Sequence, residues 1–208
     1  MSIDLPIDLD NVKGFLADDE AAALFKLAEA ANAPILEVGS YCGKSTIYLG
    51  VAAKKKGNVV FAVDHHRGSE EHQLGEEYHD PDLYDSSVAL MDTFKEFRKN
   101  MRAANLEDTV VPIVSNSQVA SKTWSTPLDL VFIDGGHSFE AAHIDYRSWA
   151  SQVKIGGHLV IHDLFPNPDE GGQAPITIYR LAIASGLFEE VEVVNTLGIL
   201  KRVQNDKF

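Results

Sequence analysis

The stretch ILEVGSYCGKST, residues 35–46, decides the fold of this chain. Its apolar run ends in Glu37, two glycines follow at Gly39 and Gly43, and a helix-forming segment comes next. In parallel sheets the first strand passes into a helix through such a turn, which surrounds a small anionic or ribose-bearing ligand. The ligand therefore has to be read from the spacing of this turn.

Two nucleotide motifs fail on that spacing. A phosphate-binding loop needs four residues between its first glycine and Gly-Lys-Ser, but Gly39 leaves three before Gly43. A dinucleotide fingerprint needs a glycine where Tyr41 stands. One acid followed by Gly-x-x-x-Gly suits S-adenosylmethionine instead, because Glu37 can meet an ammonium group and helix-start N–H groups can meet a carboxylate. Asp64 can then hold the ribose hydroxyls, although both acids could also be plain strand-end residues.

Composition narrows the class of protein. The chain has 208 residues, which suits one domain, 1–208, and a net charge of −13, which disfavours nucleic acid as a partner. The single cysteine, Cys42, excludes an internal disulfide framework and a cysteine-based zinc cluster. We see neither a signal peptide nor a membrane-spanning run, so we expect a cytoplasmic protein with no membrane contact.

Strands and helices alternate along the chain after an N-terminal arm at residues 1–18. Helix is predicted to resume near Ser87, because Leu90, Phe94, Phe97 and Met101 recur at helical spacing. Gly156 and Gly157 are predicted to turn the chain into a strand at 158–161. Buried strands are predicted at 34–39, 58–64, 109–114 and 128–133, and a terminal hairpin at 189–194 and 197–203. This pattern predicts an α/β, doubly wound sheet with one antiparallel strand near its edge.

The loop at 65–86, HHRGSEEHQLGEEYHDPDLYDS, is longer than connections in compact domains usually are. We interpret it as a substrate lid that keeps water from the reaction, although a solvated acidic loop remains the alternative. His65 lies next to the expected ribose site. The residues that we expect to meet substrate are His66, Arg67 and Tyr78 in this loop, and Gln173, which could instead make a dimer contact.

Four segments together resemble class I S-adenosylmethionine-dependent O-methyltransferases: ILEVGSYCGKST, VDHHRG, FIDGGHSFEAAHIDY and VKIGGHLVIHD. The branch that includes macrocin-type and cephalosporin-biosynthesis enzymes is the most similar, over residues 33–205, and HHRGSEEHQ and DEGGQAPITIYR are similar to small actinobacterial sugar methyltransferases, mannoside-methylating members among them. The resemblance implies a Rossmann-like seven-stranded sheet in the order 3-2-1-4-5-7-6, strand 7 antiparallel, with helices on both faces. It implies cofactor contacts from Glu37, Gly39, Ser40, Tyr41, Gly43, Ser45, Asp64, His65, Ser115, Ser117 and Asp134.

Asp134, His162 and Asp163 follow two strands expected to be neighbours, and His137 begins the next helix over the same crevice. His137 can act as the base that deprotonates an acceptor hydroxyl, or it can be a helix-start residue bonded to backbone. In the related enzymes the positions of Asp134, His162 and Asp163 bind magnesium. Family members often have a carboxylate where His162 stands, and imidazole suits manganese better than magnesium, so His162 could instead face substrate.

These observations predict an S-adenosylmethionine-dependent O-methyltransferase for a hydroxylated small molecule such as a sugar or glycoside, assisted by Mg²⁺ or Mn²⁺ and working as a homodimer. The alternative is a metal-dependent hydrolase that uses the histidine-rich loop with Asp134 and Asp163. That alternative leaves the glycine turn without a function. A third possibility is a cofactor-binding partner protein without catalysis.

Overall fold

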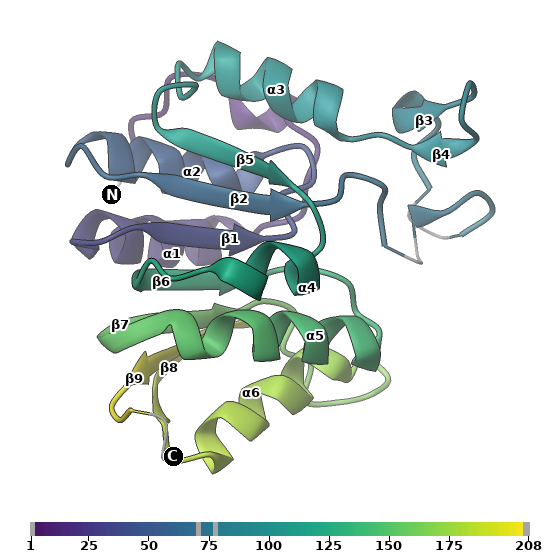
Figure 1. Cartoon of the computed structure of the whole chain (residues 1–208). Coiled ribbons are helices and arrows are strands. Elements are labelled where there is room, and N and C mark those ends of the chain that lie inside the picture. The colour runs from purple at the N-terminus through teal and green to yellow at the C-terminus, as the bar shows by residue number, and fades with distance from the viewer. Residues whose placement is uncertain (1–2, 70–71, 77–78, 206–208) are drawn as a thin grey trace.

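One sheet of seven strands runs through the molecule in the order β5-β2-β1-β6-β7-β9-β8 (Figure 1). The computed structural model describes residues 3–69, 72–76 and 79–205. The first five strands in this order are parallel, and β9 is antiparallel to β7 and β8. The predicted order 3-2-1-4-5-7-6, with strand 7 antiparallel, is therefore confirmed. The strands are β1 Ile35–Val38, β2 Val60–Asp64, β5 Val110–Val114, β6 Leu128–Ile133, β7 Val153–Ile161, β8 Phe188–Val194 and β9 Leu197–Arg202.

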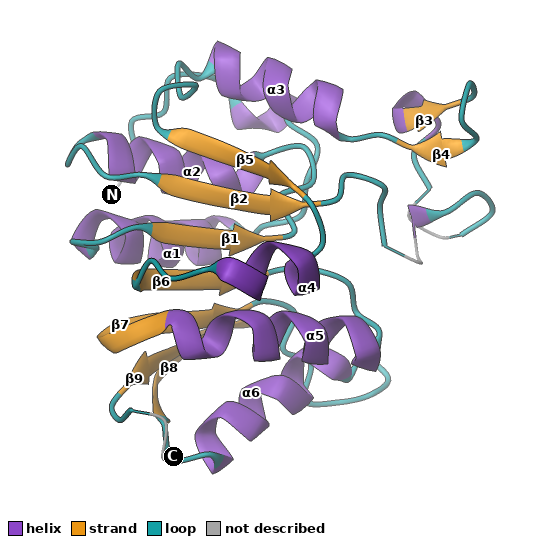
Figure 2. Cartoon of the chain, viewed as in Figure 1, coloured by secondary structure: helices purple, strands orange, loops and turns teal. Residues whose placement is uncertain are grey.

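Helices cover both faces of the sheet (Figure 2). Alternate residues of β1 divide between two cores, since Ile35 packs with the helices of one face and Leu36 with those of the other. Four residues of β1 and six of β6 are all buried, which is why both strands read as unbroken apolar runs. The helices are α1 Asp18–Ala30, α2 Lys44–Lys54 and α3 Phe94–Ala103 on one side, and α4 Ser117–Ala120, α5 Phe139–Trp149 and α6 Ala174–Ala184 on the other.

Two local predictions are wrong. The helix expected from Ser87 begins only at Phe94, because Asp92 Oδ1 accepts a hydrogen bond from the Phe94 N–H and starts the helix there. The residues before it form a small hairpin of β3, Tyr84–Asp85, and β4, Leu90–Met91, which stands beside the main sheet (Figure 1).

The second error concerns Gly156 and Gly157, which lie inside β7 rather than before it. The ladder between β6 and β7 changes register between Leu128 and Leu130, so this strand accommodates an irregularity where the glycines stand. A side chain on Gly157 would begin 2.8 Å from the Asp129 carbonyl oxygen. Gly157 therefore permits close strand approach, and Gly156 adopts a positive φ of 83° within the irregular part of the strand. A turn signal alone does not reveal these uses.

The N-terminal arm packs on the domain. Leu9 and Val12 are buried in the core. Lys13 Nζ contacts Asp80 Oδ2 at 2.6 Å and Asp82 Oδ2 at 3.1 Å, and thereby joins the arm to the predicted lid. Lys44 Nζ also donates to the Gly14 carbonyl at 3.4 Å. The arm thus borders the crevice that the glycine turn opens into.

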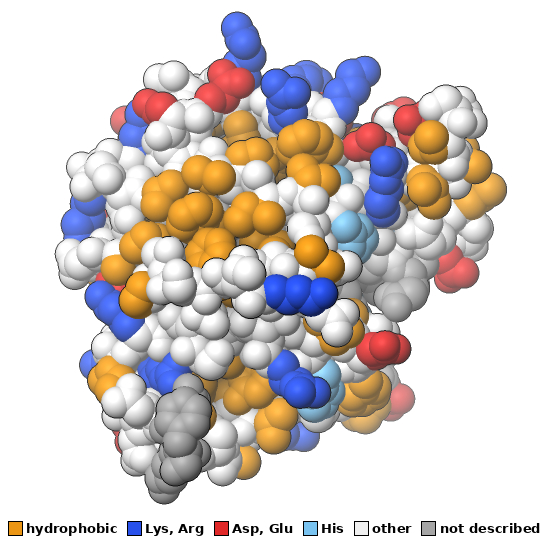
Figure 3. All heavy atoms as spheres, in the orientation of Figure 1, with side chains coloured by type: hydrophobic (Ala, Val, Ile, Leu, Met, Phe, Trp, Pro, Cys, Tyr) orange, Lys and Arg blue, Asp and Glu red, His pale blue; other side chains and the backbone are white. Residues whose placement is uncertain are grey.

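Strand β5 forms one edge of the sheet, and its surroundings are apolar. Because α4 has only four residues, part of the sheet face near this edge remains uncovered. Val111, Val114 and Val119 are exposed there, and hydrophobic side chains gather over β5 and β2 in the space-filling view (Figure 3). Pro112 stands at the centre of β5. Among the described residues, no helix is long and apolar enough to cross a membrane.

Candidate active site

The glycine turn joins β1 to α2 and is held by Asp64 at the end of β2. Asp64 Oδ2 accepts a hydrogen bond from the Tyr41 N–H at 2.8 Å, and Tyr41 adopts a positive φ of 45°. Gly39 has a φ of 85°, and a side chain there would begin 2.0 Å from the Asp134 carbonyl oxygen. Gly39 therefore lets the ends of β1 and β6 approach each other, which places the turn directly beside the Asp134 region.

Glu37 lies beneath this turn with no exposed surface. Its carboxylate accepts hydrogen bonds from Ser45 Oγ at 2.5 Å and from Thr46 Oγ1. Burial raises the pKa of Glu37 to about 8, an effect that the two hydroxyl donors oppose and the charges of Asp134 and Asp64 reinforce. Glu37 is therefore a buried acid whose nearest partners are neutral.

One crevice of about 1140 Å³ runs from the glycine turn to the ends of β6 and β7. The structure brings most of the sequence-predicted site residues to its walls. They are Gly39, Ser40, Tyr41, Ser45, Asp64, His65, Ser115, Ser117, Asp134, His137, His162 and Asp163. The predicted lid also contributes, because Gly68, Ser69, His72 and Gln73 line the same crevice.

Other predicted residues lie away from the crevice walls. Glu37 is below the floor, and Gly43 faces Phe97 and Met101, where a side chain would begin 2.7 Å from Met101 Cε. Tyr78 lies outside the described residues.

Three residues that we expected to meet substrate do not line the crevice. His66 is buried, bonds to Thr93 Oγ1 at 2.7 Å and packs on the rings of Phe94 and Phe97, because its positive φ of 58° turns it toward α3. Arg67 donates to the Met91 carbonyl and holds the small hairpin. Gln173 donates to the Phe165 carbonyl at 2.9 Å and braces the loop before α6. These contacts organise the loops around the crevice, although His66 Nε2 is buried without a hydrogen-bond partner in the described structure and Arg67 is partly exposed. Substrate contact by these three residues stays a prediction.

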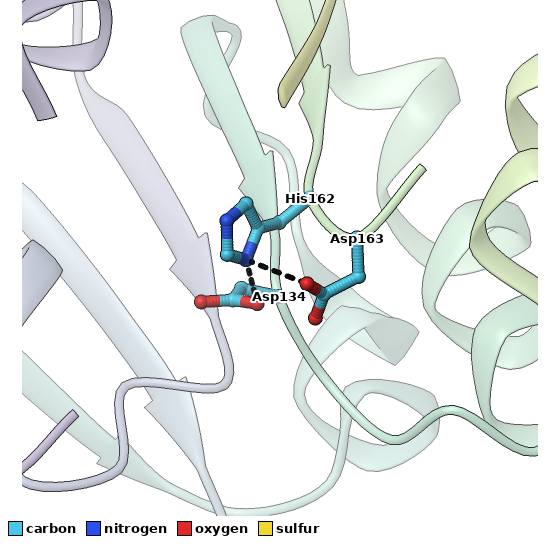
Figure 4. A group of neighbouring side chains, drawn as sticks. All are labelled: Asp134, His162 and Asp163. Carbon is cyan, nitrogen blue, oxygen red and sulfur yellow. Dashed lines mark hydrogen bonds and ion pairs between the residues drawn. The ribbon is translucent and has the colours of Figure 1, made fainter. Parts of the chain in front are cut away.

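At the far end of the crevice, His162 lies between carboxylates (Figure 4). Its Nδ1 is 3.0 Å from Asp134 Oδ1 and 3.6 Å from Asp163 Oδ1. Its Nε2 is 3.0 Å from Glu20 Oε2. Burial alone would lower the pKa of His162, but Asp134, Asp163 and Glu20 outweigh it and raise the pKa to about 10. The three carboxylates around His162 thus favour the protonated ring.

Asp134, His162 and Asp163 each offer one ligand atom within 4.8 Å of the others, so they could hold a metal ion. Burial raises the pKa of Asp134, although His162 opposes that shift. Asp163 also contacts His137, whose Nε2 is 2.9 Å from Asp163 Oδ2. Burial would raise the pKa of Asp163, but the hydrogen bond from His137 and the charge of His162 lower it. The end of the crevice thus joins a possible base to a possible metal site through Asp163.

Sequence reasoning missed two buried acids. Glu20, in the first turn of α1, reaches His162 across 142 residues of sequence. Asp145 on α5 lines the crevice beside Ser117, and burial raises the pKa of Asp145 to about 6. An acid in the first turn of a helix is already accounted for by the helix dipole, and Asp145 follows no strand. Only the helical spacing of Asp145 from the start of α5 could have indicated its inward direction.

The strand order, the single antiparallel strand and the glycine turn at the crevice define a class I methyltransferase fold. Residues 36–164 match the family model described as a methyltransferase domain. This match spans more than half of the chain, so the chain belongs to that methyltransferase family and is expected to act as an enzyme of this class.

Solved structures agree on the fold. The O-methyltransferase NovP has 17% identity and a TM-score of 0.66, over 89% of this chain and 80% of NovP. TomG from Streptomyces achromogenes, an O-methyltransferase solved with S-adenosylmethionine, has 14% identity and a TM-score of 0.64, over 91% of this chain and 82% of TomG. An O-methyltransferase from Bacillus cereus, solved with S-adenosylhomocysteine, has 18% identity and a TM-score of 0.63, over 94% of this chain and 86% of the Bacillus enzyme. The hydrolase alternative finds no support among these comparisons.

Proposed function

We propose that this chain is an S-adenosylmethionine-dependent O-methyltransferase that acts on a hydroxyl of a polar small molecule such as a sugar or glycoside. One observation carries the proposal: a single crevice has the glycine turn and Asp64 at one end and Asp134, His137 and Asp163 at the other. Methyl transfer needs a cofactor and an acid–base centre within one space. TomG and the Bacillus enzyme, which share the fold, were solved with this cofactor or its product.

The residues at the glycine turn fit the cofactor. Ser40 Oγ is buried and has no hydrogen-bond partner in the described structure, although Ser40 lines the crevice, so a ligand there would satisfy it. Ser45 lines the crevice and its hydroxyl donates to Glu37, so an ammonium group bound there would favour the ionised form of this buried acid. The bound cofactor supplies an electrophilic methyl group. The chain binds its ammonium through the Glu37–Ser45 pair and its ribose through Asp64.

The other end fits a divalent cation. Two carboxylates and one imidazole provide donors close together, and Mn²⁺ suits this mixed set better than Mg²⁺ does. When bound, such an ion lowers the pKa of a coordinated hydroxyl. In this proposal Asp134, His162 and Asp163 hold the ion. His137, oriented by its contact with Asp163, takes the hydroxyl proton.

The crevice walls favour a polar acceptor. His72 and Gln73 from the loop at 65–86, and Asp169 and Glu170 from the loop after β7, line it with hydrogen-bonding groups. Hydroxyl-rich molecules can form further hydrogen bonds with such groups, and an apolar acceptor cannot. One of these loops follows β2 and the other follows β7, and both contribute residues to the crevice wall. If the loops close over the crevice, they would exclude water from the transfer.

The test combines binding with activity. Calorimetry with S-adenosylhomocysteine should show saturable binding, and a panel of sugars, glycosides and phenols should reveal methyl transfer that a chelator abolishes. His137→Ala should lower kcat by about 10²–10⁴-fold while cofactor binding changes by less than about twofold. The matched control is His143→Ala on the same helix, since His143 does not line the crevice.

Three outcomes would contradict the proposal. Absence of S-adenosylhomocysteine binding up to millimolar concentration overturns the cofactor assignment. Full activity in His137→Ala overturns its role as base. Chelator-insensitive transfer overturns the metal and leaves His137 as the group that activates the hydroxyl.

A further inference from the structure

Glu20 reaches the acceptor end of the crevice from outside every segment in which the sequence indicated chemistry. It lies in the first turn of α1, and only 2% of its surface is exposed. A buried carboxylate is costly unless its oxygens accept hydrogen bonds. The direction of those bonds therefore shows what this side chain does.

The two oxygens of Glu20 have separate tasks. Oε1 accepts from the Thr196 N–H at 2.9 Å and from Thr196 Oγ1 at 2.6 Å, in the turn between β8 and β9. Oε2 accepts from the Ala17 N–H at 3.0 Å and faces His162 Nε2 at 3.0 Å. One oxygen therefore fastens α1 to the sheet, and the other is directed at the histidine.

This arrangement fixes how His162 is presented. Because an ionised carboxylate can only accept hydrogen bonds, Nε2 must carry a hydrogen and donate to Glu20. The remaining nitrogen, Nδ1, faces Asp134 Oδ1 and Asp163 Oδ1, as Figure 4 shows. A histidine that ligates a metal typically donates its other N–H to a carboxylate in this way, which fixes the ring and its tautomer.

We propose that Glu20 is the positioning residue of the metal site, holding His162 by Nε2 so that Nδ1 is the ligand atom toward Asp134 and Asp163. This inference rests on the metal site of the proposed function. It adds a residue that touches neither acceptor nor cofactor. It also explains why α1 begins where it does, since the carboxylate that presents His162 also accepts the Ala17 N–H at the helix start.

Glu20→Gln tests the proposal with little change in shape. The amide has one accepting oxygen, but the carboxylate accepts from donors on both sides. If that oxygen stays with Thr196, the amide N–H₂ faces Nε2, which must then accept, and the ring hydrogen moves to Nδ1, the ligand atom. The matched control is Thr196→Val, which removes one donor to Oε1 and leaves the contact between Oε2 and His162 in place.

The measurement is Mn²⁺ binding to the free protein, by calorimetry and by the electron paramagnetic resonance signal of unbound Mn²⁺. The wild type should bind one ion. Glu20→Gln should weaken binding by about 10–100-fold, and Thr196→Val by no more than about twofold. S-adenosylhomocysteine binding, measured in parallel, should be retained in all three proteins.

Equal Mn²⁺ affinity in the wild type and Glu20→Gln would overturn the proposal, as would an equal loss in both variants, since either result leaves Glu20 a merely structural role. No Mn²⁺ binding by a wild type that binds S-adenosylhomocysteine would overturn the metal site and the Glu20 role together. Selective loss in Glu20→Gln, in a protein that does not bind S-adenosylhomocysteine, would support the Glu20 role while overturning the methyltransferase cofactor assignment.

Discussion

Two buried glutamates stand on the same face of the sheet in opposite electrostatic conditions. Glu37 accepts hydrogen bonds only from the neutral hydroxyls of Ser45 and Thr46, and burial raises its pKa to about 8. Burial also acts to raise the pKa of Glu20, but hydrogen bonds from Thr196, His162 and the Ala17 N–H outweigh it and lower the pKa. Both side chains are almost fully removed from solvent, but Glu37 lies deeper and lacks a cationic partner, whereas both oxygens of Glu20 have hydrogen-bond donors.

The difference between the two glutamates indicates that they have different roles at the crevice. A carboxylate without a cationic partner is a place where a positively charged ligand gains binding energy. A carboxylate that is already paired holds protein structure. In this reading Glu37 serves the ligand and Glu20 serves the fold and the orientation of His162. Three experiments test this contrast between Glu20 and Glu37, and a fourth tests a contact of the N-terminal arm.

The largest effect should come from Glu20→Ala. It leaves the His162 ring, the Thr196 N–H and the Ala17 N–H without their buried acceptor. Breaking a buried pair in this way costs about 3–5 kcal/mol of unfolding free energy. Scanning calorimetry should show a melting temperature lower by about 6–20 °C. A loss of less than about 1 kcal/mol would show that Glu20 is not the better-paired of the two acids.

Glu37→Gln should show the opposite pattern. Because the partners of Glu37 are hydroxyls, which can donate or accept, the amide can keep both contacts that the protonated acid makes, and at pH 4.5, where that form is populated, unfolding free energy should change by less than about 1 kcal/mol. Affinity for S-adenosylhomocysteine should fall by about 1.5–3 kcal/mol, or roughly ten- to a hundredfold, because the charge beneath the ammonium is removed. Unchanged affinity in calorimetry would mean that Glu37 does not act on the ligand.

The pH dependence of the free protein offers a finer test. The pKa of Glu37 is raised from 4.5 in the unfolded chain to about 8 in the fold, so folding favours its protonated form. Its contribution to stability is fully present below pH 4.5 and is lost as pH rises toward about 8. The stability difference between wild type and Glu37→Gln, from urea titrations, should decline over that window. A difference that stays constant with pH would contradict the raised pKa.

The smallest change in stability should come from Lys13, whose ion pairs with two acids are exposed to solvent. Lys13 contacts Asp80 and Asp82, and these two acids and the lysine are partly or largely exposed. Lys13→Ala should therefore lower unfolding free energy by no more than about 1 kcal/mol. Hydrogen exchange should nevertheless quicken at residues 79–85, because the arm no longer holds that loop. Unaltered exchange there would show that the loop is held by its own contacts.

The sequence predicted the fold well because the sheet carries strong signals. Strands such as β1 and β6 are buried on both faces and so read as apolar runs, and Glu37, Gly39 and Asp64 mark the places where strands end. The residues at one end of a parallel sheet must converge, so the gathering of Asp134, His137 and Asp163 could be predicted from strand order alone.

The rest could not be predicted, for two physical reasons. Consecutive loop residues do not reveal their directions, and His66 turns into the core because of a single positive φ, while its neighbour His65 lines the crevice. Long-range pairs leave no local pattern, so nothing near Glu20 indicates a histidine 142 positions later. An acid in the first turn of a helix already has a sufficient local explanation in the helix dipole.

Pro112 has a consequence for the behaviour of many copies in solution. In the parallel ladder, Val60 donates to the Thr109 carbonyl and Ser115 donates to the Asp64 carbonyl, so the backbone nitrogens of residues 110, 112 and 114 do not face β2. Val110 already donates to the Leu106 carbonyl at 2.9 Å, outside the sheet. Proline has no hydrogen to offer at the middle of these three positions. A strand from another molecule that paired with this apolar edge would find no N–H donor at its centre. Pro112 therefore disfavours the addition of a strand from a second copy at this edge.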